Sequence, residues 1–91
     1  MRYTVQFKEQ ALRDALRLQK SEPAAYRKLR QLIEELAEHP YSGTGKPERL
    51  KGDMNGYWSR RITPKHRLVY KVYESEIVVM VLTAYGHYDD K

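Results

Sequence analysis

The chain of 91 residues contains no cysteine and only three histidines. The absence of cysteine excludes disulfides and cysteine-ligated metal sites, and it is typical of proteins that work in a reducing interior. Three scattered histidines without paired carboxylates do not form a ligand set, so we expect neither a metal nor another cofactor. The sequence also lacks the glycine-rich phosphate-binding motif of nucleotide hydrolases.

Long hydrophobic segments are missing as well. The longest apolar run, Ile77 to Leu82, is six residues long, whereas a membrane-spanning helix needs about 20. The opening MRYTVQF lacks the apolar core of a signal peptide. We therefore expect a cytoplasmic protein without a membrane partner, and the length predicts a single domain over residues 1–91.

Positive charge is abundant and unevenly distributed. The formal net charge is +5, and residues 41–71 hold eight Lys or Arg against two acids, Glu48 and Asp53. The same segment contains Tyr57, Trp58 and Tyr70. A basic segment interleaved with aromatic residues indicates the backbone of RNA or DNA as a partner.

Hydrophobic spacing predicts the element order β-α-α-β-β-β. Residues 2–7 alternate as in a strand, residues 8–20 and 23–38 have helical spacing, and strands are expected at 57–62, 66–73 and 77–83. Residues 41–56 are punctuated by glycine and fit no period. In the first helix we expect Asp14 to face water and Ala11, Leu12, Ala15 and Leu16 to face the core.

These elements predict an α+β fold, with two N-terminal helices packed on one face of a mainly antiparallel four-stranded sheet. The first strand should join the edge of the later meander. In the strand at 67–73, alternation directs Leu68 and Tyr70 toward the helices. The uncovered face then presents Arg67 and Lys71.

Four motifs occur together in this chain: GTGKPERLK at 43–51, GYWSRRI at 56–62, HRLVY at 66–70 and a His87-Tyr88 pair near the end. In this combination the chain resembles the YoeB/Txe toxins of the RelE/ParE-type toxin–antitoxin superfamily. The match is close over 43–70 and follows element order elsewhere. The resemblance implies a RelE-like microbial RNase fold and the toxin component of a type II toxin–antitoxin system. It also implies a ribosome-dependent mRNA endoribonuclease that inhibits translation.

The resemblance implies that Glu48 is the general base, Arg67 the phosphate clamp, His87 the general acid and Tyr88 a positioning residue. Metal-independent cleavage by 2′-OH attack needs such a base, cation and acid. Arginine binds phosphate in a planar fork, and histidine titrates near neutrality. The residues alone also fit simpler interpretations: a solvated loop acid, a strand-end arginine, an inert histidine and a surface tyrosine.

Further RNA or phosphate contacts are expected from basic and aromatic neighbours of these residues. Arg60 and Arg61 point to opposite faces of their strand, so only one can reach the active face, and the other could pair with an acid. His39 and His66 are expected to be structural. The additional candidates are Lys46, Arg49, Lys51, Arg60, Arg61 and Tyr85.

The resemblance implies two partners, mRNA on the ribosome with contacts to ribosomal RNA, and a YefM/Axe-type antitoxin. Homodimerisation, which is common in the family, is left open. The sequence departs from the family where Asp89-Asp90-Lys91 follow Tyr88, which adds acids beside a phosphate-binding site. Two alternatives therefore stay open: a binding-only superfamily toxin that acts on another target, and an attenuated, non-catalytic RNA-binding member.

Overall fold

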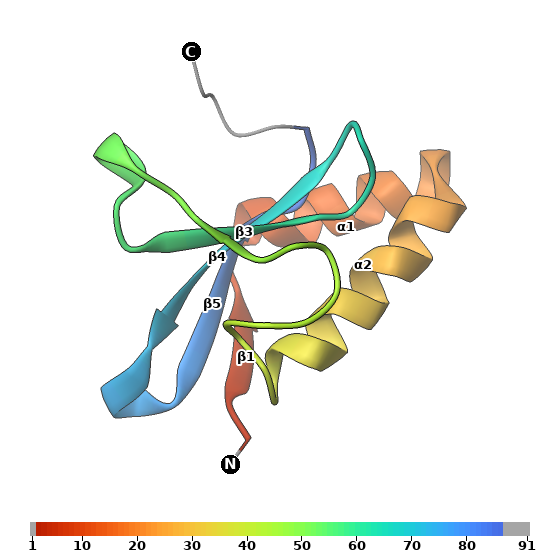
Figure 1. Ribbon diagram of the computed structural model, residues 1–91. Coiled ribbons are helices and arrows are strands. Elements are labelled where there is room, and N and C mark those ends of the chain that lie inside the picture. The colour runs from red at the N-terminus through yellow and green to blue at the C-terminus, as the bar shows by residue number, and fades with distance from the viewer. Residues whose placement is uncertain (1, 87–91) are drawn as a thin grey trace.

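The computed structural model describes residues 2–86. Two helices are followed by most of the sheet, and both ends of the described chain lie at the surface (Figure 1). The elements are β1 (Thr4–Phe7), α1 (Glu9–Ser21), α2 (Pro23–Leu36), β2 (Glu48–Arg49), β3 (Tyr57–Arg61), β4 (Arg67–Tyr73) and β5 (Val78–Thr83), with short 3₁₀ helices at Gly52–Met54 and Glu74–Glu76.

The strands of the described chain form one five-stranded sheet in the order β1-β5-β4-β3-β2. β1 runs parallel to β5 and the other pairs are antiparallel. The α+β class and the edge position of the first strand are confirmed. The expected four strands are corrected to five, because the two-residue β2 pairs with β3 inside the irregular segment. A strand that short has no alternating pattern for the sequence to reveal.

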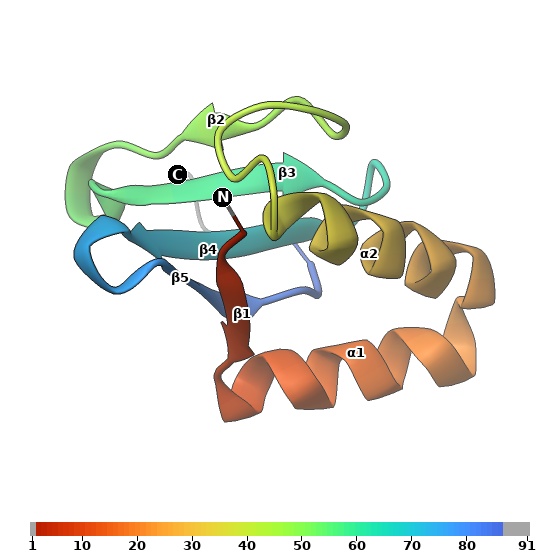
Figure 2. The same ribbon diagram turned by 90° about the horizontal axis from the view of Figure 1, so that it is seen from below.

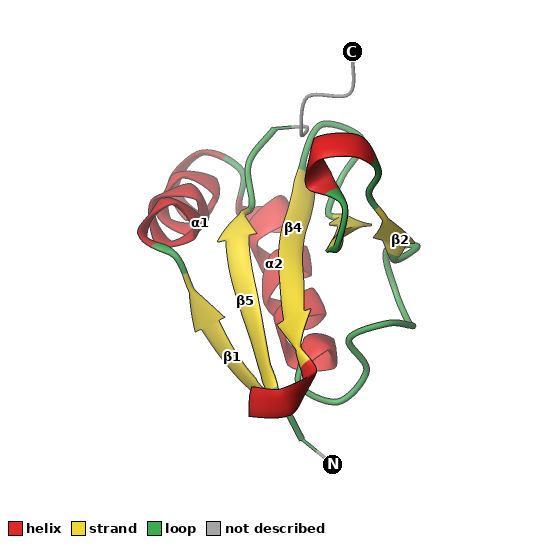
Figure 3. Ribbon diagram, turned by 90° about the vertical axis from the view of Figure 1, so that its left-hand side faces the viewer, coloured by secondary structure: helices red, strands yellow, loops and turns green. Residues whose placement is uncertain are grey.

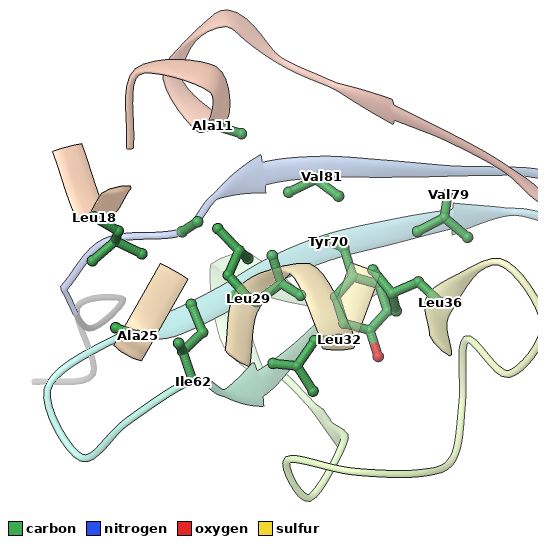
Figure 4. Close-up of a cluster of buried hydrophobic side chains, with 12 residues drawn as sticks. Ala11, Leu18, Ala25, Leu29, Leu32, Leu36, Ile62, Tyr70, Val79 and Val81 are labelled. Carbon is green, nitrogen blue, oxygen red and sulfur yellow. The ribbon is translucent and has the colours of Figure 1, made fainter. Parts of the chain in front are cut away.

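Both helices lie on the same face of the sheet (Figure 2), and the other face is open to the viewer in Figure 3. The core lies between the helices and β4–β5, where Leu29, Leu32 and Leu36 of α2 meet Tyr70, Val79 and Val81 (Figure 4). Leu68 and Tyr70 are fully buried on the helix side, as predicted.

The α1 helix is rotated relative to the sequence prediction. Leu12 and Leu16 are 52% and 61% exposed, whereas Asp14 is only 6% exposed. The Asp14 carboxylate accepts hydrogen bonds from Gln10 (2.8 Å) and from the backbone N–H of Ala84 (2.9 Å). These two hydrogen bonds offset part of the cost of burying the carboxylate. The predicted apolar stripe at Leu12 and Leu16 is wrong, because both side chains are exposed.

The two helices are separated by a single residue, Glu22, whose backbone is not helical. Pro23 occupies the first turn of α2, where its missing N–H is no loss. This short link places α1 and α2 side by side, and it brings Glu22 to the corner of the molecule where the β3–β4 turn lies.

Candidate active site

The open face of the sheet brings Glu48 and Arg67 together. Glu48 pairs with Ser59 across β2–β3, and Arg61 pairs with Arg67 across β3–β4. The Arg67 Nη1 lies 3.4 Å from Glu48 Oε1 and 3.2 Å from the Ser59 hydroxyl. A carboxylate, a hydroxyl and a guanidinium therefore share one surface.

A cleft of about 290 Å³ opens beside this pair, near the lower end of the range for small-ligand sites. Its walls contain three cationic side chains and one carboxylate. The cleft is lined by Gly45, Lys46, Pro47, Glu48, Arg61 and Arg67. This charge balance suits an anionic ligand that also needs a proton acceptor within reach.

The loop that carries Glu48 is fixed to β3 by a close backbone contact. The Arg61 N–H donates to the Gly45 carbonyl (2.7 Å). Gly45 has a φ of +87°, and an added Cβ would meet the Arg61 carbonyl oxygen at 3.0 Å, so only glycine fits there. The next residue, Lys46, also adopts a left-handed φ of 52°. Non-glycine residues in this region are strained, and such strain concentrates at functional sites.

A buried arginine holds the preceding part of the same loop. Arg60 is fully buried and pairs with Glu35 of α2 at 3.0 Å. It donates further hydrogen bonds to the Tyr70 hydroxyl and to the carbonyls of His39, Ser42 and Thr44. Every donor group of this guanidinium is engaged, and the segment from His39 to Gly45 is thereby tied to α2 and β3.

Glu35 completes this arrangement. It accepts hydrogen bonds from the Thr44 N–H (2.9 Å) and the Thr44 hydroxyl (2.6 Å). Burial raises the pKa of the Glu35 carboxyl, but the Thr44 hydrogen bonds and the Arg60 charge outweigh it and hold the pKa below its usual value. The carboxylate therefore stays charged and keeps the loop in place.

The other residues predicted to contact RNA lie in different parts of the structure. Arg60 is fully buried and pairs with Glu35, as expected for the one of the two arginines that does not reach the active face, and its burial does not favour a contact with RNA. Lys46 and Arg61 line the cleft, whereas Arg49 and Lys51 do not. Both of the latter are exposed. Arg49 follows Glu48 in β2, and alternation turns it to the opposite face.

Tyr85 is held within the protein. Its ring lies 4.3 Å from the His66 ring, between centroids, and the Arg17 guanidinium lies 4.0 Å over it. These contacts do not favour the base-stacking role expected for Tyr85. His66 is buried and fully hydrogen-bonded, which agrees with its expected structural character.

His87 and Tyr88, the predicted acid and positioning residue, lie outside the described residues. The chain that leads to them is described as far as Gly86, whose carbonyl accepts a hydrogen bond from the Arg67 N–H at 2.9 Å. The chain therefore leaves the described region next to the proposed phosphate clamp.

Two residues of the site were missed by the sequence interpretation. Ser59 is fully buried beneath Arg67 and contacts its guanidinium. Glu35 orders the loop from α2, a helix far away in sequence. Alternation along β3 could have placed Ser59 on the face of Arg61, but no sequence signal pairs Glu35 with Arg60.

Within residues 2–86 no group of three or more His, Asp or Glu is placed so that it could hold a metal ion. No helix in the same range is long and apolar enough to cross a membrane.

The fold is that of RelE/YoeB-type toxins. The structure of a YoeB/ParE toxin from Agrobacterium tumefaciens matches with a TM-score of 0.87 and 39% identity, over 93% of this chain and 99% of that one. A YoeB dimer from Staphylococcus aureus matches with a TM-score of 0.83 and 32% identity, over 97% and 100%. The S. aureus toxin is also known in a YoeB–YefM complex.

Sequence comparison narrows this class. Residues 7–88 match the family of YoeB-like toxins of bacterial type II toxin–antitoxin systems. Toxin YoeB of Mycobacterium bovis is 41% identical over 85 residues, which are 93% of this chain and 98% of that protein. The chain belongs to the YoeB-like toxin family.

Proposed function

We propose that this toxin is an endoribonuclease that cuts mRNA on the ribosome without a metal ion. The observation that carries the proposal is the meeting of Glu48 and Arg67 on the rim of a cationic cleft. A base beside a phosphate-binding cation is what 2′-OH attack requires. The family membership supports the same activity.

The proposed reaction assigns one step to each of the four predicted residues. Glu48 removes the proton of a ribose 2′-OH, and the oxygen attacks the adjacent phosphorus. The O2′–P bond forms, the P–O5′ bond breaks, and the 5′-oxygen takes a proton from His87. The products are a 2′,3′-cyclic phosphate and a 5′-OH end. Arg67 stabilises the charge that develops on the phosphoryl oxygens, and Tyr88 positions the phosphate.

The Glu48–Arg67 contact must open for this to happen. At 3.4 Å, with Glu48 58% exposed, the pair is worth no more than about 1 kcal/mol. A phosphate can replace the carboxylate on Arg67 at little cost, which leaves Glu48 to act as a base. The contact therefore acts as a resting state that RNA displaces.

The partners follow from the same charge pattern. The basic cleft should attract an acidic antitoxin segment, and the S. aureus relative is known in complex with YefM. We infer that a YefM/Axe-type antitoxin covers the cleft. Action on translating ribosomes places the protein in the cytoplasm, where Lys46 and Arg61 would contact mRNA or ribosomal RNA. The S. aureus relative is known as a dimer, and homodimerisation of this chain stays an open prediction.

The test is to map mRNA 5′ ends after brief induction of the wild type, Glu48→Gln and Arg67→Gln. Cuts in the register of the decoding site should appear with the wild type and vanish with both variants. Glu9→Gln changes an exposed carboxylate on α1 and should leave the cuts in place. Growth arrest that survives Glu48→Gln combined with His87→Gln, without cuts, would instead show a toxin that acts by binding alone.

A further inference from the structure

Three hydrogen bonds fix the chain where it leaves β5. The Ala84 N–H donates to Asp14 (2.9 Å), the Gly86 N–H donates to the His66 Nδ1 (2.8 Å), and the Gly86 carbonyl accepts from the Arg67 N–H (2.9 Å). The first bond ties the exit to α1, and the other two tie it to the start of β4. The backbone N–H and the carbonyl of Gly86 are therefore both hydrogen-bonded, the first to His66 and the second to Arg67.

The hydrogen bonds of His66 define its tautomer. A backbone N–H can only donate, so the Nδ1 that receives the Gly86 N–H carries no proton. The ring hydrogen is on Nε2, which lies 2.8 Å from Glu22 Oε2. His66 is only 2% exposed. The carboxylate in the α1–α2 link therefore holds the ring in the one orientation that accepts the Gly86 N–H.

The surroundings reinforce this orientation. Hydrogen bonding from His66 lowers the pKa of the Glu22 carboxyl, which keeps it charged. Lys65 Nζ lies 3.7 Å from the same carboxylate, and the Tyr85 ring packs against the imidazole. Gly86 has a φ of +72°, so the chain turns sharply at the held residue in a conformation that favours glycine.

We propose that His66, oriented by Glu22, is a positioning residue for cleavage. This role rests on the proposed function, because it consists in positioning the proposed acid, His87, relative to the proposed phosphate clamp, Arg67. His87 is covalently next to Gly86, and consecutive Cα atoms are about 3.8 Å apart. Holding Gly86 against the Arg67 backbone therefore fixes the point from which the chain continues to the proposed acid.

Two matched substitutions separate the bonds of His66. In His66→Asn the amide oxygen can stand where Nδ1 stands and accept the Gly86 N–H, but the side chain is too short to reach Glu22. In His66→Gln the amide can reach Glu22 but leaves the Gly86 N–H without its acceptor. Both variants lose the buried ring, so both should melt at a lower temperature than the wild type.

Cleavage of mRNA on purified ribosomes, with kcat and KM measured in the steady state and the chemical step checked by single turnover, tests the proposal. Because misplacement of about 1 Å can lower a rate about 10²-fold, His66→Gln should lose about 10²-fold in kcat. His66→Asn should lose less than about tenfold, and KM should stay nearly unchanged in both. Equal losses in the two variants, or losses that follow only their melting temperatures, would overturn the positioning role.

Nuclear magnetic resonance of the ¹⁵N-labelled full chain reports the contact without any cleavage. The wild type should show an unprotonated Nδ1 in His66 and a Gly86 amide protected from exchange. That protection should persist in His66→Asn and disappear in His66→Gln. A protonated Nδ1 or an unprotected Gly86 amide in the wild type would overturn the proposal while the proposed function stood. Absence of cleavage by the wild type would overturn both.

Discussion

Arg60 and Arg67 lie on neighbouring strands and carry the same guanidinium group, yet the sheet places them in opposite environments. Arg60 faces the helices, is fully buried, and gives its hydrogen bonds to Glu35, Tyr70 and three loop carbonyls. Arg67 faces the open side, where its side chain is 18% exposed and meets Glu48 over a long contact of 3.4 Å. The Arg60 guanidinium uses all its donors within the protein, whereas the Arg67 guanidinium lines the cleft.

This difference shows how one small domain separates stability from chemistry. The buried Arg60–Glu35 pair orders the loop that ends in Lys46-Pro47-Glu48, so the carboxylate of the cleft is held by a pair on the far side of the sheet. Alternation along β3 and β4 is sufficient to divide the two roles. The comparison predicts that loss of Arg60 strongly destabilises the fold, whereas loss of Arg67 leaves a folded, inactive protein.

The largest effect is expected for Arg60→Met. It removes the cation paired with the Glu35 carboxylate and the donor to the carbonyls of Ser42 and Thr44, and breaking a buried pair in this way costs about 3–5 kcal/mol. A domain of this size has a total free energy of unfolding of only about 5–14 kcal/mol. Urea denaturation should show the loss. Arg61→Met, on the exposed neighbour, should stay within about 0.5 kcal/mol of the wild type, and equal losses in both variants would break the comparison.

Arg67→Gln should produce the converse result. Removing a preorganised cation from the transition state lowers a rate about 10²–10³-fold, or about 2.7–4 kcal/mol. The same change should alter the free energy of unfolding by about 1 kcal/mol, because the Glu48 contact is partly exposed. Single-turnover cleavage on ribosomes and urea denaturation measure the two quantities. A variant that unfolds but keeps its rate per folded molecule would show that Arg67 has only a structural role.

Glu35→Gln tests the buried side of the comparison through pH. At neutral pH it should lower the free energy of unfolding by about 1.5–3 kcal/mol, since it weakens hydrogen bonds to a charged group. The pKa of Glu35 is lower in the folded protein than its ordinary value of 4.5. Its contribution is therefore complete above that value and is lost as the pH falls through the lower folded-state pKa. Urea denaturation at neutral pH and at about pH 3 should show the two proteins converging in acid. A constant difference would mean that the charge of Glu35 is not responsible.

The sequence could predict the parts of this comparison that depend on period. Alternation in β4 correctly placed Leu68 and Tyr70 inside and Arg67 outside, and helical spacing found both helices. The motifs named Glu48 and Arg67 as candidates for one site. In the structure both lie on the same face of the sheet, because β2 pairs with β3. Their catalytic roles stay predictions.

Periodicity could not reveal side-chain contacts between residues that lie far apart in the sequence. Arg60 looks like any cation of a basic segment until Glu35 of α2 and three loop carbonyls surround it. Asp14 looks like a solvent-facing acid until the Ala84 N–H reaches it. In both cases tertiary hydrogen bonds hold a charged residue in the interior, and beside Asp14 the apolar residues Leu12 and Leu16 are left exposed.

The smallest effect is expected for Arg61→Gln, at the exposed cation that lines the cleft beside Arg67. Its free energy of unfolding should stay within about 0.5 kcal/mol of the wild type. If Arg61 neutralises one phosphate, the slope of log affinity against log salt should fall by about 0.7 for single-stranded RNA. Fluorescence anisotropy with a labelled RNA at several KCl concentrations measures this slope. Lys20→Gln, an exposed cation of α1 outside the cleft, is the matched control and should leave the slope unchanged. An unchanged slope for Arg61→Gln would show that Arg61 neutralises no phosphate, and that the RNA-binding site is smaller than the lining of the cleft.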